Sequence, residues 1–237
     1  MAEGNLVIEL RGVSKDYRGL RPLRIERLEI SEGQAVAILG FDQTTAEVLV
    51  SLITGAITPD AGEVIVFGQS TRDIVDAEAW LGGLDQFGIL SERAVLLDQL
   101  TAEQNLAVPF SLELDDMAED LRSWVRHLAD EVGLDDHELK ARVATLGAAA
   151  RQRVRLGRAL ALRPRVLLAE HPNASLNPES LPEFAADLSA VVSARALTSL
   201  VLTADRTFAG AVASTVLELN PATGELKPSA GWRKWFT

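Results

Sequence analysis

The chain contains no cysteine in its 237 residues, which excludes disulfides and thiolate metal sites. Its three histidines, His127, His137 and His171, are scattered without the spacing of metal ligands. No apolar run reaches the roughly 18 residues that a membrane-spanning helix needs. Residues 1–5 also lack the basic and then apolar pattern of a signal peptide. We therefore expect a cytoplasmic protein without a transmembrane segment.

Basic residues are scarce, with 23 lysines and arginines against 34 acidic residues and a net charge of −11. Nucleic-acid-binding proteins present basic faces, so this balance argues against a nucleic-acid partner. Arg151, Arg155 and Arg158 form one local exception, because their spacing places them on one face of a helix. That face either contacts another subunit or is a solvated surface with intrachain ion pairs.

A strand, a turn and a helix are predicted between residues 34 and 54. Residues 34–40 form an apolar run that ends in Gly40, and residues 44–54 have apolar side chains at helical spacing. This order is the scaffold of a nucleotide phosphate loop. A working loop reads Gly-x-x-x-x-Gly-Lys-Ser/Thr, because the glycines let backbone N–H groups approach the phosphates, the lysine neutralises them and the hydroxyl holds Mg²⁺.

The loop of this chain lacks those chemical groups. Counting from Gly40, Thr45 stands at the glycine position, Ala46 at the lysine and Glu47 at the hydroxyl. A carboxylate about 4 Å from a phosphate charge is repelled by roughly 4 kcal/mol at an effective dielectric of 20. Loss of the lysine removes a further 1.5–3 kcal/mol or so. The alternative is that residues 40–47 are an ordinary strand-to-helix turn.

Further segments, in the same order and spacing, resemble the nucleotide-binding subunit of ATP-binding cassette (ABC) transporters over residues 6–219. They are residues 6–17, with Tyr17 where the family stacks an aromatic ring on adenine, and residues 61–68, 100–106 and 152–168. The resemblance implies an α/β fold: a P-loop NTPase-like (RecA-like) core with a parallel sheet, an antiparallel β subdomain and a helical lobe. It further implies one domain over residues 1–237, with the antiparallel part at 5–36 and the lobe at about 92–163.

The same resemblance places several family motifs on residues that differ from the family pattern. The signature Leu-Ser-Gly-Gly-Gln falls on residues 146–150, which read Leu-Gly-Ala-Ala-Ala and have no hydroxyl. The departing positions are Thr45, Ala46 and Glu47 in the phosphate loop, Glu92 at the Q-loop glutamine, Gly147, Ala148 and Ala149 in the signature, Glu170 at the Walker B aspartate, His171 at the catalytic glutamate, Asn177 at the D-loop aspartate and Ala204 at the switch histidine.

Phosphoryl transfer relies on positioning and charge stabilisation, so these losses predict an inactive ATPase with no catalytic residue and no metal. No cofactor is expected; ATP and Mg²⁺ bind at most weakly, through Tyr17 and a vestigial Gly40. The predicted function is a pseudo-ATPase that serves as a structural or regulatory part of a transport complex. One alternative is an active ATPase with Glu170 on Mg²⁺ and His171 as base. Another is a soluble interaction protein without a transporter.

The family docks on a permease through a groove near the Q-loop, which here falls on residues 88–97 and 106–110. The candidate docking residues are Leu90, Glu92, Leu96, Leu97 and Phe110. Alternatively, the apolar members simply fill the lobe interface. The resemblance also implies a homodimer or a heterodimer with another ABC ATPase-like chain, on the cytoplasmic face of the inner membrane. The tail, residues 231–237, mixes aromatic and basic groups and either contacts the membrane surface or packs on its own domain.

Overall fold

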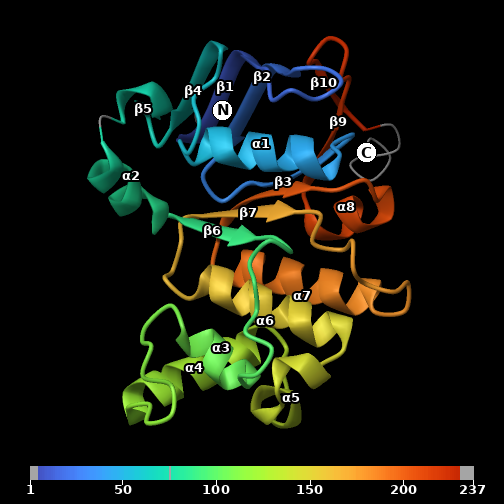
Figure 1. Cartoon of the computed structure of the whole chain (residues 1–237). Coiled ribbons are helices and arrows are strands. Elements are labelled where there is room, and N and C mark those ends of the chain that lie inside the picture. The colour runs from blue at the N-terminus through green and yellow to red at the C-terminus, as the bar shows by residue number, and fades with distance from the viewer. Residues whose placement is uncertain (1–4, 75, 230–237) are drawn as a thin grey trace.

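The computed structural model describes residues 5–74 and 76–229, and their strands form two sheets (Figure 1). The larger sheet has the strand order β10-β9-β3-β8-β7-β6, and the smaller has the order β2-β1-β4-β5. Helices pack on these sheets, so the α/β class predicted from the sequence is confirmed. The aromatic and basic tail predicted at residues 231–237 lies outside the described residues.

The centre of the larger sheet is parallel. Neighbouring parallel strands there are β3 (Ala35–Leu39), β8 (Thr198–Leu202), β7 (Val166–Glu170) and β6 (Phe87–Leu90). Strand β9 (Thr215–Leu219) continues it parallel to β3, and β10 (Leu226–Pro228) closes the edge as an antiparallel hairpin partner. Every residue of β7 and β8 is buried, which explains their apolar runs, since strands covered on both faces have no solvent side.

The smaller sheet is antiparallel. It consists of β1 (Leu6–Lys15), β2 (Leu23–Ser31), β4 (Ala61–Val66) and β5 (Gln69–Ser70). Helix α1 (Gln43–Ile53) lies between this sheet and the larger one (Figure 1). Its Leu49 and Leu52 belong to one hydrophobic cluster with Ile8 of β1 and Leu168 of β7. The two sheets therefore hold α1 from both sides and fix its N-terminus at the carboxyl end of β3.

Most other helices cover the opposite side of the larger sheet (Figure 1). They are α3 (Ala102–Ala107), α4 (Glu119–Glu131), α5 (Asp136–Lys140), α6 (Ala148–Leu160) and α7 (Leu181–Ala194). A second hydrophobic cluster, which includes Leu106, Leu128 and Leu188, joins them to the sheet. The remaining α-helices in the described part of the chain are α2 (Ala77–Leu84), after β5, and α8 (Arg206–Val212), before β9. Within the described residues, no helix combines the length and apolar character needed to cross a bilayer.

Candidate functional site

The candidate site forms where β3 gives way to α1. Gly40 follows β3 with a φ of +98°, a conformation that favours glycine. A Cβ at Gly40 would also lie 3.1 Å from the carbonyl oxygen of Leu219 in β9. The turn then leads to Asp42, the N-cap of α1. The strand, tight turn and helix predicted from residues 34–54 are therefore present, and the helix N-terminus is presented at the sheet edge.

Asp42 supplies a negative charge to this helix N-terminus. Its Oδ1 accepts hydrogen bonds from the backbone N–H and the Oγ1 of Thr45, both at 2.7 Å. The bond from the Thr45 side chain, then the one from its backbone, holds the pKa of Asp42 below its ordinary value. Helix N-termini attract anions, so this carboxylate satisfies donors at the end of the helix where phosphate binds in a working loop.

Tyr17 joins the same group of contacts. Its hydroxyl lies 3.1 Å from Oγ1 of Thr45, and its ring lies so close to Gly19 that a Cβ there would stand 2.3 Å from the ring atom Cε2. Next to it opens a cavity of about 500 Å³, whose lining includes Tyr17, Gly40 and Arg21. The two residues predicted as nucleotide contacts, Tyr17 and Gly40, thus line one cavity at the start of α1.

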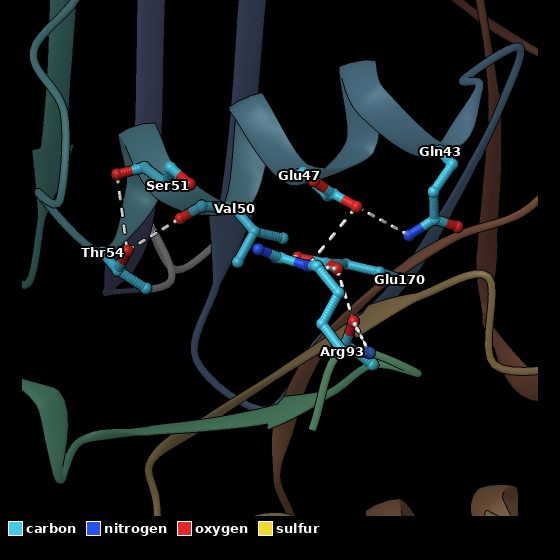
Figure 2. A network of polar contacts seen from close by, with 8 residues as sticks. Gln43, Glu47, Val50, Ser51, Thr54, Arg93 and Glu170 are labelled. Atoms are coloured by element: carbon cyan, nitrogen blue, oxygen red, sulfur yellow. Dashed lines mark hydrogen bonds and ion pairs between the residues drawn. The ribbon is translucent and has the colours of Figure 1, made fainter. Parts of the chain in front are cut away.

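A buried carboxylate faces this turn from β7. Glu170 is fully buried and accepts a hydrogen bond from Oγ of Ser91 at 2.7 Å. Arg93 donates to both of its oxygens, from Nη2 to Oε1 at 2.5 Å and from Nε to Oε2 at 3.2 Å. The same Nε lies 3.4 Å from Oε1 of Glu47 in α1. Figure 2 shows the Arg93 side chain between the helix and the strand, linking the two carboxylates.

Arg93 is held firmly in its charged form. Burial alone would lower the pKa of its guanidinium, but the hydrogen bond and the charge of Glu170, assisted by Glu47, raise it above its ordinary value. Gln43 completes the network by donating from Nε2 to Oε1 of Glu47 at 3.2 Å (Figure 2). Arg93 and Ser91 were not found from the sequence, although both follow β6 directly and face the Walker B position.

The two carboxylates suit a divalent cation, because hard cations such as Mg²⁺ prefer carboxylate oxygens. Glu47 and Glu170 already converge on one positive group, the Arg93 guanidinium. No set of three or more acidic, histidine or cysteine side chains that could hold a metal occurs among the described residues. A metal at Glu47 and Glu170 would therefore also need phosphate or water ligands. Bound there, it would neutralise charge on a nucleotide's phosphates.

His171 directly follows Glu170 in an unusual backbone conformation. Its φ is +44°, which is strained for a residue with a side chain, and its N–H donates to the carbonyl oxygen of Leu202 at 2.8 Å. Its Nε2 is buried and has no hydrogen-bond partner among residues 5–74 and 76–229. Strained residues concentrate at functional sites, and an unpartnered imidazole nitrogen can accept a proton. His171 thus has the local features of a base.

The other predicted motif positions are dispersed. The side chain of Ala46, at the lysine position, is fully buried in the cluster beneath α1. Gly147 is the N-cap of α6, without a side-chain cap, and Ala148 and Ala149 begin that helix. Asn177 accepts a hydrogen bond from the backbone of Ser180 at 2.9 Å. Exposed Ala204 follows β8. The structure therefore groups Gly40, Thr45, Glu47, Glu170 and His171 and leaves the signature positions apart, on α6.

The predicted docking residues divide into two groups. Leu90 is fully buried and Leu96 is 6% exposed, and both belong to the cluster beneath the helices. Their assignment to a docking surface needs correction, because an apolar run beside a loop does not tell which side chains turn inward. Glu92 is exposed, and the side chains of Leu97 and Phe110 are 44% and 39% exposed. Val95, not singled out from the sequence, is 72% exposed.

The basic face of α6 borders these exposed residues. Arg151 forms an ion pair with Asp98 at 3.0 Å, and Nη1 of Arg158 donates to the carbonyl oxygen of Val95 at 2.7 Å. Burial lowers the pKa of Arg155 and of Arg158, and within the described part of the chain neither has a carboxylate partner at ion-pair distance. The intrachain ion pair expected for this face is therefore made by Arg151 alone of the three.

Comparison with known proteins identifies clear relatives. A family model described as ABC transporter matches residues 23–174. The methionine import ATP-binding protein MetN 2 of Pseudomonas syringae pv. tomato is 30% identical over 178 residues, covering 73% of this chain and 52% of that protein. The lipoprotein-releasing system ATP-binding protein LolD of Acinetobacter baylyi is 30% identical over 176 residues, covering 73% of this chain and 77% of that protein.

Solved structures support the same fold. The dimeric ATP-binding cassette MJ0796, bound to ADP and Pi, has a TM-score of 0.75 and 23% identity, covering 93% of this chain and 98% of that one. At this identity the match concerns the fold alone. The chain spans about half the length of the curated relatives that it matches first.

These matches overturn two predictions made from the sequence. The chain is predicted there to be an inactive ATPase and to take no cofactor, with ATP and Mg²⁺ bound at most weakly. Both predictions are wrong, because the relatives that cover 73% of the chain are named ATP-binding proteins. The physical reason is that a position-by-position reading counts the groups that one loop has lost. It does not take account of contacts that other segments make at the site, such as those by which Ser91 and Arg93, after β6, hold the Glu170 carboxylate.

Proposed function

Because this chain belongs to the ABC transporter family, we propose that it is the ATP-binding subunit of a membrane transporter and works with an integral membrane permease. The family match includes β3, the turn at Gly40, α1 and β7, which together build the candidate site. The names of the relatives mention methionine, phosphonates and lipoproteins, so they do not agree on a cargo. The proposal therefore extends to the ATP-binding role and not to a transported substrate.

The observation that carries the proposal is the buried Glu170, which faces the first turns of α1 across Arg93. In this arrangement the base of the nucleotide enters the cavity beside Tyr17, and its phosphates lie toward the N-terminus of α1, near the two carboxylates that would hold a metal. The helix N-terminus contributes a favourable partial charge, although Asp42 offsets part of it. Equilibrium binding of ATP to the purified chain tests this directly.

Turnover requires a group that accepts a proton from water, and His171 is the candidate. Its unpartnered Nε2 is buried beside Glu170, at the end of β7. As the water oxygen bonds to the γ-phosphorus, the bond from that phosphorus to the bridging oxygen breaks. The electron pair leaves with ADP, and the water proton moves to Nε2. Such general-base assistance typically contributes 10²–10⁴-fold to a rate.

The permease-facing surface is proposed to combine the exposed segment between β6 and α3 with one face of α6. We call Val95, Leu97, Arg155 and Arg158 the docking patch, with Glu92 and Phe110 as further exposed candidates. Two exposed apolar side chains lie beside two half-buried guanidiniums that have no carboxylate partner in the described part of the chain, which suits an amphipathic helix that carries an acidic residue. Through this patch the chain would lie peripherally on the cytoplasmic face of the membrane, as a homodimer or with a second ABC ATPase-like chain.

Purification of the tagged chain from solubilised membranes tests the partner. The proposal predicts that a multi-spanning membrane protein co-purifies with the wild-type chain and is lost with the variant Leu97→Asp. Leu81→Asp on α2 is the matched control, because Leu81 is 57% exposed and lies outside the patch. Absence of any multi-spanning partner, or equal recovery with both variants, contradicts the docking proposal.

A further inference from the structure

Arg93 occupies the place between Glu47 and Glu170 at which a cation would bind (Figure 2). We infer that Arg93 is a resident cation that competes with the nucleotide-bound metal for these two carboxylates and must leave before the metal binds. The inference rests on the proposed ATP-binding function and concerns the regulation of the same site.

The competition follows from the oxygens involved. Arg93 donates to both oxygens of Glu170, at 2.5 and 3.2 Å, and Ser91 donates to one of them at 2.7 Å. Glu170 is fully buried and Arg93 is half exposed, so a cation from solvent would reach Glu170 from the side that Arg93 now covers. These three bonds use most of the roughly four lone-pair sites of the carboxylate. A metal ion bound to Glu170 therefore competes with Arg93 for the same two oxygens and meets the positive charge of its guanidinium.

The arginine is the partner that can move. Its side chain is 49% exposed, whereas that of Glu170 is not exposed at all. Its Nη1 has no hydrogen-bond partner among the residues that the structure describes. It also lies in the irregular segment between β6 and α3, outside any regular element. Rotation of the Arg93 side chain can therefore carry the guanidinium into solvent without unfolding a helix or strand.

Charge favours the exchange once a metal is present. Glu47, Glu170 and Arg93 together carry one net negative charge, which repels the phosphates of a nucleotide. A divalent ion in place of Arg93 brings the pair of carboxylates to neutrality. Without a replacement cation, however, Glu170 would be left as an unpaired buried charge. Arg93 therefore stays paired with Glu47 and Glu170 until a metal ion and a nucleotide bind together.

The size of the effect depends on how completely Arg93 is engaged. The apparent dissociation constant equals the intrinsic one divided by the fraction of molecules in the open state. If Arg93 is engaged in nine molecules of ten, its removal tightens Mg-ATP binding about tenfold. ATP without metal gains nothing from the removal, because no second cation takes the vacated place.

The test measures ATP affinity by calorimetry for the wild-type chain, Arg93→Gln and Arg93→Lys, with Mg²⁺ and with EDTA. Arg93→Gln is expected to bind Mg-ATP about tenfold more tightly than the wild type and metal-free ATP no more tightly. Arg93→Lys keeps the charge but cannot donate to both oxygens of Glu170 at once, so we expect Mg-ATP affinity between those of the wild type and Arg93→Gln. If Arg93→Gln does not fold, Arg93→Lys takes its place in the test. Arg27→Gln removes an exposed pair with Glu29 on β2 and should change neither affinity.

A second measurement, thermal unfolding, does not depend on activity. Mg²⁺ with ATP should raise the unfolding temperature of Arg93→Gln more than that of the wild type. Weaker or unchanged Mg-ATP binding in both Arg93 variants overturns the inference, since Arg93 would then be a phosphate ligand or a bystander. In that case the proposed function stands, provided that the wild type binds ATP. If neither the wild type nor any variant binds ATP under either condition, the inference and the proposed function both fail.

Discussion

Gly88 of β6 lies directly against the carbonyl oxygen of Ala159 in α6, where a Cβ on the glycine would stand 2.3 Å from that oxygen. Real Cβ atoms do not approach backbone atoms so closely, so strand and helix can reach this spacing only with glycine. Ser91 and Arg93, the partners of Glu170, follow immediately after β6. The contact between Gly88 and Ala159 therefore helps to set where the Glu170 network lies.

Gly88→Ala is expected to lower the free energy of unfolding by about 1–3 kcal/mol, because the added methyl group must push β6 and α6 apart. Urea denaturation measures this. Gly82→Ala is the matched control, because Gly82 is inside α2 and, among the described residues, a Cβ there would meet no atom within 4 Å beyond its chain neighbours and the backbone of its own helix. Alanine at that helical position should be neutral or stabilise by up to about 1 kcal/mol. Equal effects at both positions would refute the packing argument.

Arg93→Ala should destabilise the chain, because it leaves the buried Glu170 charge without its main partner. Removing one partner of a buried ion pair costs about 3–5 kcal/mol, and the half-exposed Arg93 places this case at or below the lower end. The double variant Arg93→Ala with Glu170→Gln should recover most of the loss, since no charge then remains buried. A double-mutant cycle by urea denaturation measures the coupling, and strictly additive effects would show that the two side chains do not interact.

Asp42→Ala removes the N-cap of α1 and should cost about 1 kcal/mol at neutral pH. The pKa of Asp42 is lowered in the folded chain, by the hydrogen bond from the Thr45 side chain first. A lowered pKa means that the charged carboxylate stabilises the fold above the unfolded pKa of about 3.9, and that this contribution disappears as the pH falls through the folded value.

The stability difference between the wild type and Asp42→Ala should therefore shrink as the pH is lowered below about 4. This difference is measured from the urea denaturation midpoints of the two proteins at a series of pH values from 7 downward. Asp42→Asn keeps a good cap without a titrating charge and serves as the control. A difference that stays constant over the whole acidic range would mean that the carboxylate charge contributes nothing at this helix end.

His171→Gln should reduce the rate of ATP hydrolysis about 100-fold or more, since the proposed base is lost. The affinity for Mg-ATP should change little, because His171 is assigned to the proton and not to the phosphates. Steady-state phosphate release and calorimetry together separate the two quantities. Undiminished turnover in His171→Gln would remove His171 from the reaction.

The backbone around the site could be predicted from local sequence signals. Residues 34–40 and 166–169 read as buried strands, and the structure contains β3 and β7 there. The helix expected at residues 44–54 is α1, which begins one residue earlier and ends one residue earlier. The predictions for these segments are correct because the spacing of apolar residues, the position of a glycine and the length of a strand can all be read from a short stretch of sequence.

The charge arrangement could not be predicted in the same way. Arg93 and Glu170 are 77 residues apart in the chain, and nothing in either segment indicates their contact. The burial of Leu90 and Leu96 likewise depends on how the helices pack on the sheet. Asp42 is different, because an aspartate at the start of a predicted helix is a recognisable N-cap signal. That signal could have shown that the loop carries its own anion.

Nucleotide binding at the start of α1 is the claim on which the whole account depends, and calorimetric titration of the full chain with Mg-ATP measures it most directly. The account predicts saturable binding of one nucleotide per chain, weakened by Glu170→Gln, which removes the buried carboxylate proposed to hold the metal. A titration without saturable heat up to millimolar Mg-ATP, in the wild-type chain and in Arg93→Gln alike, would contradict it.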